Sequence, residues 1–418
     1  MSDASRPSVR SASPRRAAFV HPYLLHYHYP RLEALADRCR SEGIEFANVE
    51  LAGYIDYYRT LFADGEKRFE NRVLFPGRDF DSIPYAAMWD SLSTCLGDLK
   101  PDVVFTYGYS CRIMRRVMAW AKENHIAVGL ISDSNRFDQK RRRPVEFLKS
   151  LYVSRYDAAF VGGTSSSLYL QGLGLPGERI LPGYDVVDNE SFRTKAQAAR
   201  QARPALQKKW NLAEKSFLFA GRLGPPKNLT GLIRAYRLYA ESLDGLDPWG
   251  LSICGTGPLA EELQSLVRGL PAGLARHIVF LGQTGQSDLA EVYSASSCLV
   301  LPSLTESWGL VVNEALASAL PVLVSERCGC AADLVRDGIN GWRFDPASDQ
   351  ELAGLMSRLS GLDPGKLEEM GRCGEDLISE WGLDRFAGNG LGAVRLAYQH
   401  NLKRPSKTAG REGKADGG

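Results

Sequence analysis

Two basic side chains lie on a short Gly/Pro turn in the second half of the chain. An apolar strand ends at Gly221, Arg222 and Lys227 follow on the turn, and a helix begins at Asn228. Both cations are therefore at the positive end of a helix dipole, where a positive charge is repelled by the dipole unless an anion binds beside it. The pattern indicates a phosphate-binding site. Solvated loop charges would give the same spacing, so that alternative stays open.

Two glutamates eight positions apart form a second group. Glu306 is on a polar loop after a strand, and Glu314 is two turns into the next helix, where its neighbours three and four positions away are mostly apolar. Its carboxylate only accepts hydrogen bonds, so the two hydroxyls of a sugar or ribose diol would satisfy it. Backbone N–H groups at Gly309 and Leu310 add a second anion-accepting helix start. A helix N-terminal charge at Glu306 and a buried ion pair at Glu314 remain the alternative.

Composition and charge narrow the class of protein. The chain has 418 residues, with 51 Lys and Arg against 49 Asp and Glu, which argues against a protein that mainly neutralises nucleic-acid phosphates. No run of about 18 apolar residues occurs, and residues 1–15 lack a signal-peptide core, so we expect a cytoplasmic protein. The eight cysteines are dispersed, and Cys328-Gly-Cys330 lacks the second ligand pair of a zinc site.

Short β-rich runs alternate with stretches of helical period, which predicts parallel sheets covered by helices. We expect strands at 17–20, 45–49, 72–75, 102–106, 126–132, 157–161, 217–220, 251–254, 278–281, 298–301 and 321–325. The predicted fold class is α/β with two Rossmann-like doubly wound domains. We place the domains at 16–200 and 201–382, joined by a linker at 197–212, followed by a helix at 383–401. Residues 1–15 and 402–418 are expected to be disordered tails because they are poor in apolar residues.

Five motifs occur in a fixed order between Phe217 and Pro346. They are Gly221-Arg222-Leu223, Lys227-Asn228, Gly255-Thr-Gly-Pro, Glu306 with Glu314, and Gly338-Ile-Asn-Gly341. Together they resemble the retaining GT-B glycosyltransferases of glycosyltransferase family 4, also called glycosyl transferases group 1. The resemblance implies two domains facing a cleft, with the last helix crossing back onto the first domain. It also implies a nucleotide-diphosphate sugar as donor, retention of the anomeric configuration, and neither a metal nor another cofactor.

The resemblance implies a role for each matching residue. Arg222 and Lys227 hold the donor diphosphate, Glu306 binds the transferred sugar and Glu314 binds the ribose. The remaining donor-binding positions, on backbone turns, are Gly221, Gly255, Gln283, Ser307, Trp308, Gly309 and Leu310. Charge that develops on the leaving diphosphate would be stabilised by the two cations and by helix N–H groups.

The first domain departs from the family pattern. Many members have a glycine-rich turn after the first strand, whereas residues 21–30 contain histidines and tyrosines. We expect these rings to form a polar rim for a sugar acceptor, with packing as the alternative and no metal ligation, since neither Cys nor carboxylate lies in the loop. Asp133, after a predicted strand, is our candidate for contacting or polarising the acceptor. An Asp that caps the next helix is equally consistent.

A basic region lies in the first domain. Residues 101–150 contain ten Lys and Arg against five Asp and Glu, concentrated at Arg112, Arg115, Arg116 and 140–143. A membrane surface or a lipid-phosphate-linked acceptor would attract this region by ~1 kcal/mol per basic residue. The expected partners are therefore a nucleotide sugar, a glycan or lipid-linked acceptor and, through Arg112–Arg143, the inner membrane, but no nucleic acid. A solvated basic face is the alternative.

Other enzyme classes fit less well. Gly255-Thr-Gly-Pro-Leu-Ala260 has the form of a dinucleotide fingerprint, but residues 273–285 hold no acidic residue for a ribose. A glycoside hydrolase would use two glutamates but has no need of Arg222 and Lys227. A sugar epimerase, a sugar phosphorylase and a catalytically silent partner subunit stay open as alternatives.

Overall fold

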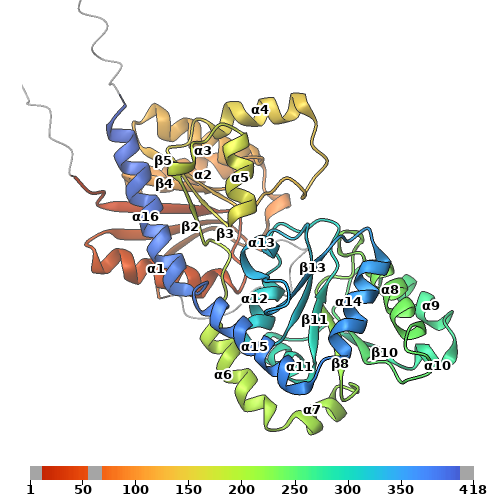
Figure 1. Ribbon diagram of the computed structural model, residues 1–418. Coiled ribbons are helices and arrows are strands. Elements are labelled where there is room, and N and C mark those ends of the chain that lie inside the picture. The colour runs from red at the N-terminus through yellow and green to blue at the C-terminus, as the bar shows by residue number, and fades with distance from the viewer. Residues whose placement is uncertain (1–11, 55–67, 405–418) are drawn as a thin grey trace, which may run out of the picture.

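The computed structural model describes residues 12–54 and 68–404 and contains two parallel sheets (Figure 1). The first has the order β3-β2-β1-β4-β5-β6-β7 and the second the order β10-β9-β8-β11-β12-β13. Each sheet therefore reverses its direction of growth near its first strand, and in such sheets ligands bind beyond the carboxyl ends of the strands at that point. Two Rossmann-like domains of this kind confirm the predicted fold class. The parts of the predicted tails at residues 1–11 and 405–418 are outside the described residues.

The strand bounds agree with those expected from the sequence to within about two residues, except that β2 and β3 are at least twice as long as expected. In the first sheet they are β1 (Arg16–His21), β2 (Glu45–Tyr54), β3 (Glu70–Asp79), β4 (Val103–Tyr107), β5 (Ala127–Ser132), β6 (Ala158–Val161) and β7 (Ile180–Pro182). In the second they are β8 (Ser216–Ala220), β9 (Gly250–Cys254), β10 (Ile278–Gly282), β11 (Cys298–Leu301), β12 (Val322–Ser325) and β13 (Gly341–Phe344). Only β7 and β13 were not predicted. Both are short edge strands, and they gain their hydrogen bonds from the neighbouring strand rather than from a strong local pattern.

Helices cover the faces of both sheets. Their bounds are α1 (His28–Ser41), α2 (Tyr85–Leu99), α3 (Arg112–Glu123), α4 (Arg143–Val153), α5 (Thr164–Gly172), α6 (Asn189–Arg200), α7 (Arg203–Lys209), α8 (Leu229–Glu241), α9 (Ala260–Arg268), α10 (Ala272–Ala275), α11 (Gln286–Ala295), α12 (Leu310–Ala317), α13 (Ala331–Leu334), α14 (Asp349–Ser360), α15 (Pro364–Ser379) and α16 (Leu383–Leu402). The expected linker at 197–212 thus contains the end of α6 and all of α7. Within the described ranges, no helix combines the length and the apolar character that a membrane span requires.

The last helix, α16, returns to the first domain, as expected. It lies across α1 and the first sheet, seen in blue over the red and orange elements of Figure 1. Phe386 is fully buried there, with its ring 5.0 Å from that of Phe160 on β6. At the other end of the helix, Nδ1 of His400 lies 3.0 Å from a carboxylate oxygen of the buried Asp157. Apolar packing and this polar contact therefore hold the end of the described chain on the first domain.

Candidate functional site

Lys227 and Glu306 come together at the carboxyl edge of the second sheet. Backbone at Gly221, with φ of 145°, takes the chain out of β8 into a 3₁₀ turn, Pro225–Lys227, just before α8. The Lys227 ammonium forms an ion pair with the Glu306 carboxylate, to which the hydroxyl of Ser303 also donates at 3.3 Å. The predicted cation and the predicted sugar-binding acid are thus direct partners.

Three glycine turns meet beside this pair. A Cβ on Gly255 would lie 1.9 Å from the carbonyl oxygen of Gly221, and Gly255 has a φ of 136°. Only glycine fits so close an approach in that conformation. The N–H of Gly255 also donates to Gly282 at 2.7 Å, which brings the following residue, Gln283, onto the third turn. The turns after β8, β9 and β10 therefore form one edge that contains Arg222, Gly255 and Gln283.

The Glu314 carboxylate is buried, with 8% of the residue exposed, in the second turn of α12. Burial raises its pKa to about 7, while a 2.8 Å hydrogen bond from the hydroxyl of Tyr293 opposes that rise. Among the described residues no cation pairs with it, so the buried ion pair considered above is wrong. Glu314 instead lines a cavity of about 150 Å³, together with His26 and Tyr27 of the first domain.

The loop between the two glutamates depends on two further glycines. Gly309, with φ of 105°, is the N-cap of α12, and a Cβ there would lie 2.9 Å from the side chain of Leu301. A Cβ on Gly329 would lie 1.8 Å from the carbonyl oxygen of Ser307. The buried segment Cys328-Gly-Cys330 therefore packs directly under the loop, which gives this cysteine pair a packing role.

Trp308 lies between the two domains. Its indole is buried, donates from Nε1 to Asn313 at 2.9 Å, and stacks near Trp381 at 5.4 Å. A Cβ on Gly163 of the first domain would lie 2.5 Å from this ring. The side chain thus fixes the loop against the first domain, and the backbone at 307–310 continues into the amino end of α12.

Asn135 makes a polar link across the domains that the sequence analysis did not identify. Its side-chain N–H groups donate to the carbonyl oxygens of Glu306 at 2.8 Å and Ser307 at 3.1 Å. Its own side-chain oxygen accepts from the N–H of Phe137 at 2.7 Å. Both N–H groups of this buried amide therefore hold the second domain's loop, while its oxygen fixes the amide to its own loop. Only its place directly after the Ser132-Asp133-Ser134 strand end marked it in the sequence.

Asp133 directly follows β5, near enough to Glu306 for the two carboxylates to interact through their charges. Burial raises the pKa of the Asp133 carboxyl, and the negative charges of Asp138 and Glu306 raise it further. The next helix, α4, begins at Arg143 with Arg142 as its N-cap. The helix-capping alternative for Asp133 is therefore wrong, and its carboxyl belongs to the space between the domains.

The expected aromatic rim is correct only in part. His21 is buried, with Nδ1 2.7 Å from Asn48 and Nε2 3.1 Å from the Tyr184 hydroxyl, and burial lowers its pKa to about 4. His28 is buried as well, so neither ring can form a rim, whereas His26 and Tyr27 line the cavity at Glu314. No group of three His, Cys, Asp or Glu side chains in 12–54 and 68–404 is placed to hold a metal ion.

Two features of the first domain were missed in the sequence. Arg31 and Asp185 form a buried pair at 3.5 Å, next to the ring of Tyr184. An Asp-x-Asp sequence is present as Asp79-Phe80-Asp81, and there Asp79 accepts a hydrogen bond from the N–H of Asp81. Its carboxylate thus caps a single turn after β3.

This chain is similar in sequence to a family model of glycosyltransferases and to curated glycosyltransferases. Residues 203–375 match the family model described as Glycosyl transferases group 1. Over 162 residues the chain is 35% identical to a D-inositol 3-phosphate glycosyltransferase of Acidothermus cellulolyticus, covering 37% of this chain and 35% of the relative. It is 32% identical over 137 residues to the sulfoquinovosyl transferase of Arabidopsis thaliana, covering 32% and 24%. The chain thus spans less than half the length of these curated relatives.

Solved structures match over nearly the whole fold. A glycosyltransferase from Rickettsia africae superposes with a TM-score of 0.71 at 13% identity, covering 93% of this chain and 99% of that one. HepE from Anabaena, solved in complex with UDP, gives 0.68 at 15% identity, covering 90% and 97%. The two-domain arrangement is therefore that of GT-B glycosyltransferase structures.

Proposed function

We propose that this chain is a retaining glycosyltransferase of the group 1 family that transfers a sugar from a nucleotide-diphosphate donor without a metal ion. The observation that carries the proposal is the convergence of Lys227, Glu306 and the Gly221 and Gly255 turns on one sheet edge, with Glu314 in the adjoining cavity. The family match covers this same domain. Two solved neighbours are complexes with UDP and with UDP-glucose, which supports the donor class.

In this proposal the donor competes with Glu306 for Lys227. A diphosphate offers the ammonium a stronger anionic partner, and Arg222 lies on the same turn to hold the second phosphate. Glu306 is then released to accept hydrogen bonds from the sugar hydroxyls, while Glu314 accepts those of the ribose. As the sugar–phosphate bond breaks, charge grows on the diphosphate, so the cations and the start of α12 stabilise the transition state more than the ground state.

The acceptor enters from the first domain. Asp133 would bind or polarise the acceptor hydroxyl, which is supported by its charge interaction with Glu306 and by the raised pKa of its carboxyl. Attack from the face that the diphosphate leaves would retain the anomeric configuration, with the leaving phosphate oxygen taking the acceptor proton. We assign the acceptor to glycans or lipid-linked sugars of polysaccharide or glycoconjugate assembly, at the cytoplasmic side of the inner membrane.

Nucleotide-sugar screening tests the proposal. A panel of nucleotide sugars should yield one that raises the melting temperature and is hydrolysed slowly, with release of the sugar in the donor's own anomeric configuration and no requirement for added divalent ions. Lys227→Ala should remove both signals and leave the fold intact. Lys209→Ala, which also removes a lysine paired with a glutamate, is the matched control and should keep them. Failure of every nucleotide to bind, or full activity in Lys227→Ala, would contradict the proposal.

A further inference from the structure

Helix α4 carries its polar residues on the inside and its apolar residues on the outside. Its outward side chains include Phe147, Leu148 and Leu151, whose exposed fractions are 64%, 56% and 49%. Val145 and Tyr152 extend the same face, and Val153 is the only buried residue of the helix. A helix on the surface of a globular protein normally buries its apolar stripe, so this reversed pattern indicates an apolar partner.

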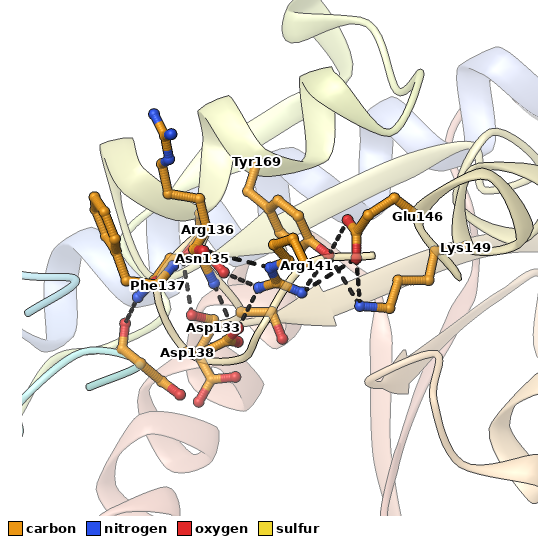
Figure 2. A network of polar contacts seen from close by, with 12 residues as sticks. Asp133, Asn135, Arg136, Phe137, Asp138, Arg141, Glu146, Lys149 and Tyr169 are labelled. Carbon is orange, nitrogen blue, oxygen red and sulfur yellow. Dashed lines mark hydrogen bonds and ion pairs between the residues drawn. The ribbon is translucent and has the colours of Figure 1, made fainter. Parts of the chain in front are cut away.

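The inward face of α4 is held by charge. Glu146 pairs with Lys149 at 2.9 Å and accepts a hydrogen bond from the Tyr169 hydroxyl at 2.8 Å (Figure 2). Arg141 donates to the same hydroxyl at 2.6 Å and lies over the Tyr169 ring at 4.1 Å. The helix is therefore fixed in this orientation by a polar network, because turning it over to bury Phe147 would break the hydrogen bonds that join Glu146 and Lys149 to the Tyr169 hydroxyl.

Every exposed charge in the stretch from residue 133 to 155, which contains α4, is positive. The exposed cations between 133 and 155 are Arg136, Lys140, Arg142, Arg143 and Arg155. The three carboxylates of the same stretch are half-buried, with Asp138 paired to Arg141, Glu146 paired to Lys149, and Asp133 facing the second domain. An apolar face with a rim of cations matches a bilayer that presents anionic head groups over hydrocarbon.

We propose that the face formed by Val145, Phe147, Leu148, Leu151 and Tyr152, with its five exposed cations, docks on an anionic lipid surface. The head groups pair with the cations, and the apolar side chains enter the boundary between head groups and acyl chains. This inference deepens the proposed function, and it rests on that function only for the lipid-linked acceptor. In Figure 1, α4 is at the top of the first domain, away from the second sheet, so docking leaves the second domain clear of the lipid surface.

The docked helix is also connected to the donor loop. Arg141 donates to the carbonyl oxygen of Asn135, and the Asn135 amide holds the carbonyl oxygens of Glu306 and Ser307. One continuous polar chain therefore runs from the inward face of α4 through Arg141 and Asn135, which Figure 2 shows, to the loop proposed to bind the sugar. Docking through the outward face leaves every contact in this chain intact.

Vesicle sedimentation tests the docking surface with the full chain. We expect binding to vesicles of phosphatidylcholine with phosphatidylglycerol, weak binding to phosphatidylcholine alone, and loss of binding at high salt. The double variant Phe147→Ser/Leu151→Ser should bind at least about tenfold more weakly, because two large apolar side chains no longer enter the bilayer. The triple variant Lys140→Gln/Arg142→Gln/Arg143→Gln should lose the preference for anionic vesicles.

Controls separate this inference from the proposed function. Leu246→Ser removes a leucine of the second domain that is even more exposed, at 73%, and this variant should bind vesicles as the wild type does. Donor hydrolysis without acceptor should be unchanged in both α4 variants, whereas failure of donor hydrolysis in the wild type would count against the glycosyltransferase instead. Vesicle binding that the α4 variants leave intact, or no binding to either vesicle, overturns the inference. A dimer of the wild type that the Phe147→Ser/Leu151→Ser variant dissociates would assign the face to a second copy and overturn it too.

Discussion

The hydroxyl of Tyr293 donates a 2.8 Å hydrogen bond to the carboxylate of Glu314, and no cation shares that carboxylate among the described residues. A buried carboxylate with one neutral donor is costly to ionise, and its pKa is raised accordingly to about 7. A position used only for stability would be better filled by an amide or an apolar side chain. The ribose diol of the proposed donor would supply the further hydrogen bonds that this carboxylate lacks.

Glu314→Gln should stabilise the fold and weaken nucleotide binding. Because the pKa of Glu314 rises from 4.5 to about 7 on folding, the native state holds its proton more tightly, and stability from this group falls as pH rises between those values. Above about pH 7 the ionised carboxylate lowers the free energy of unfolding by on the order of 3 kcal/mol, and the neutral amide of the variant avoids this loss. Melting curves should show the variant more stable at about pH 8 and equal to wild type near pH 4. Equal melting at both values would contradict the assignment.

Tyr293→Phe should move the pH dependence of nucleotide binding upward. The lost hydroxyl stabilised the ionised form of Glu314, so without it the pKa of that carboxyl rises above its present value of about 7. Affinity measured across pH should reach its plateau at a higher pH than in the wild type. Tyr236→Phe removes another buried hydroxyl of the second domain, bonded to the Trp249 carbonyl at 2.6 Å, and should leave the profile unchanged.

The sequence predicted the second domain better than the first for a physical reason. At Gly255 and Gly309 the chain needs a positive φ and a close approach to neighbouring atoms, which only glycine permits. The geometry of these turns can therefore be recognised in the sequence from the glycines themselves. The link made by Asn135 depends on two carbonyl oxygens 171 and 172 positions away, and any residue can supply a carbonyl. The spacing of apolar residues likewise could not predict that the apolar face of α4 points outward, because its inward polar face is held by Tyr169 on another helix, α5.

Glu306→Gln should separate nucleotide binding from sugar transfer. The amide no longer forms an ion pair with Lys227, so a free nucleoside diphosphate meets less competition and should bind at least as tightly as to the wild type. Transfer should fall by at least about 100-fold, because the sugar loses an anionic partner in the transition state. Calorimetry with the nucleoside diphosphate and a transfer assay measure the two effects. Weaker nucleotide binding in this variant would contradict the competition between Glu306 and the diphosphate.

Gly255→Ala should destabilise the second domain by more than about 2 kcal/mol, since its Cβ would overlap the carbonyl oxygen of Gly221 at a φ that alanine rarely adopts. Nucleotide affinity should fall with it, because the turn that contains Arg222 must shift. Gly354→Ala is the matched control. Its Cβ would meet nothing within 4 Å in α14, so helix propensity predicts a gain of ~1 kcal/mol. Chemical denaturation of both variants gives the comparison.

Asn135→Ala should lower kcat more than it raises the KM for the donor. In the second domain the Asn135 side chain donates only to the backbone at Glu306 and Ser307, so its loss leaves the cationic turn intact but frees the sugar-binding loop to move. Asn135→Asp should be worse than alanine, because a carboxylate would face two carbonyl oxygens with no proton to share. Asn389→Ala, which removes a similar amide-to-carbonyl bond of 2.8 Å to Pro182, controls for lost stability and should leave kcat unchanged. An equal loss of kcat in the Asn135 and Asn389 variants would contradict this prediction, because it would show that the cross-domain link contributes only to stability.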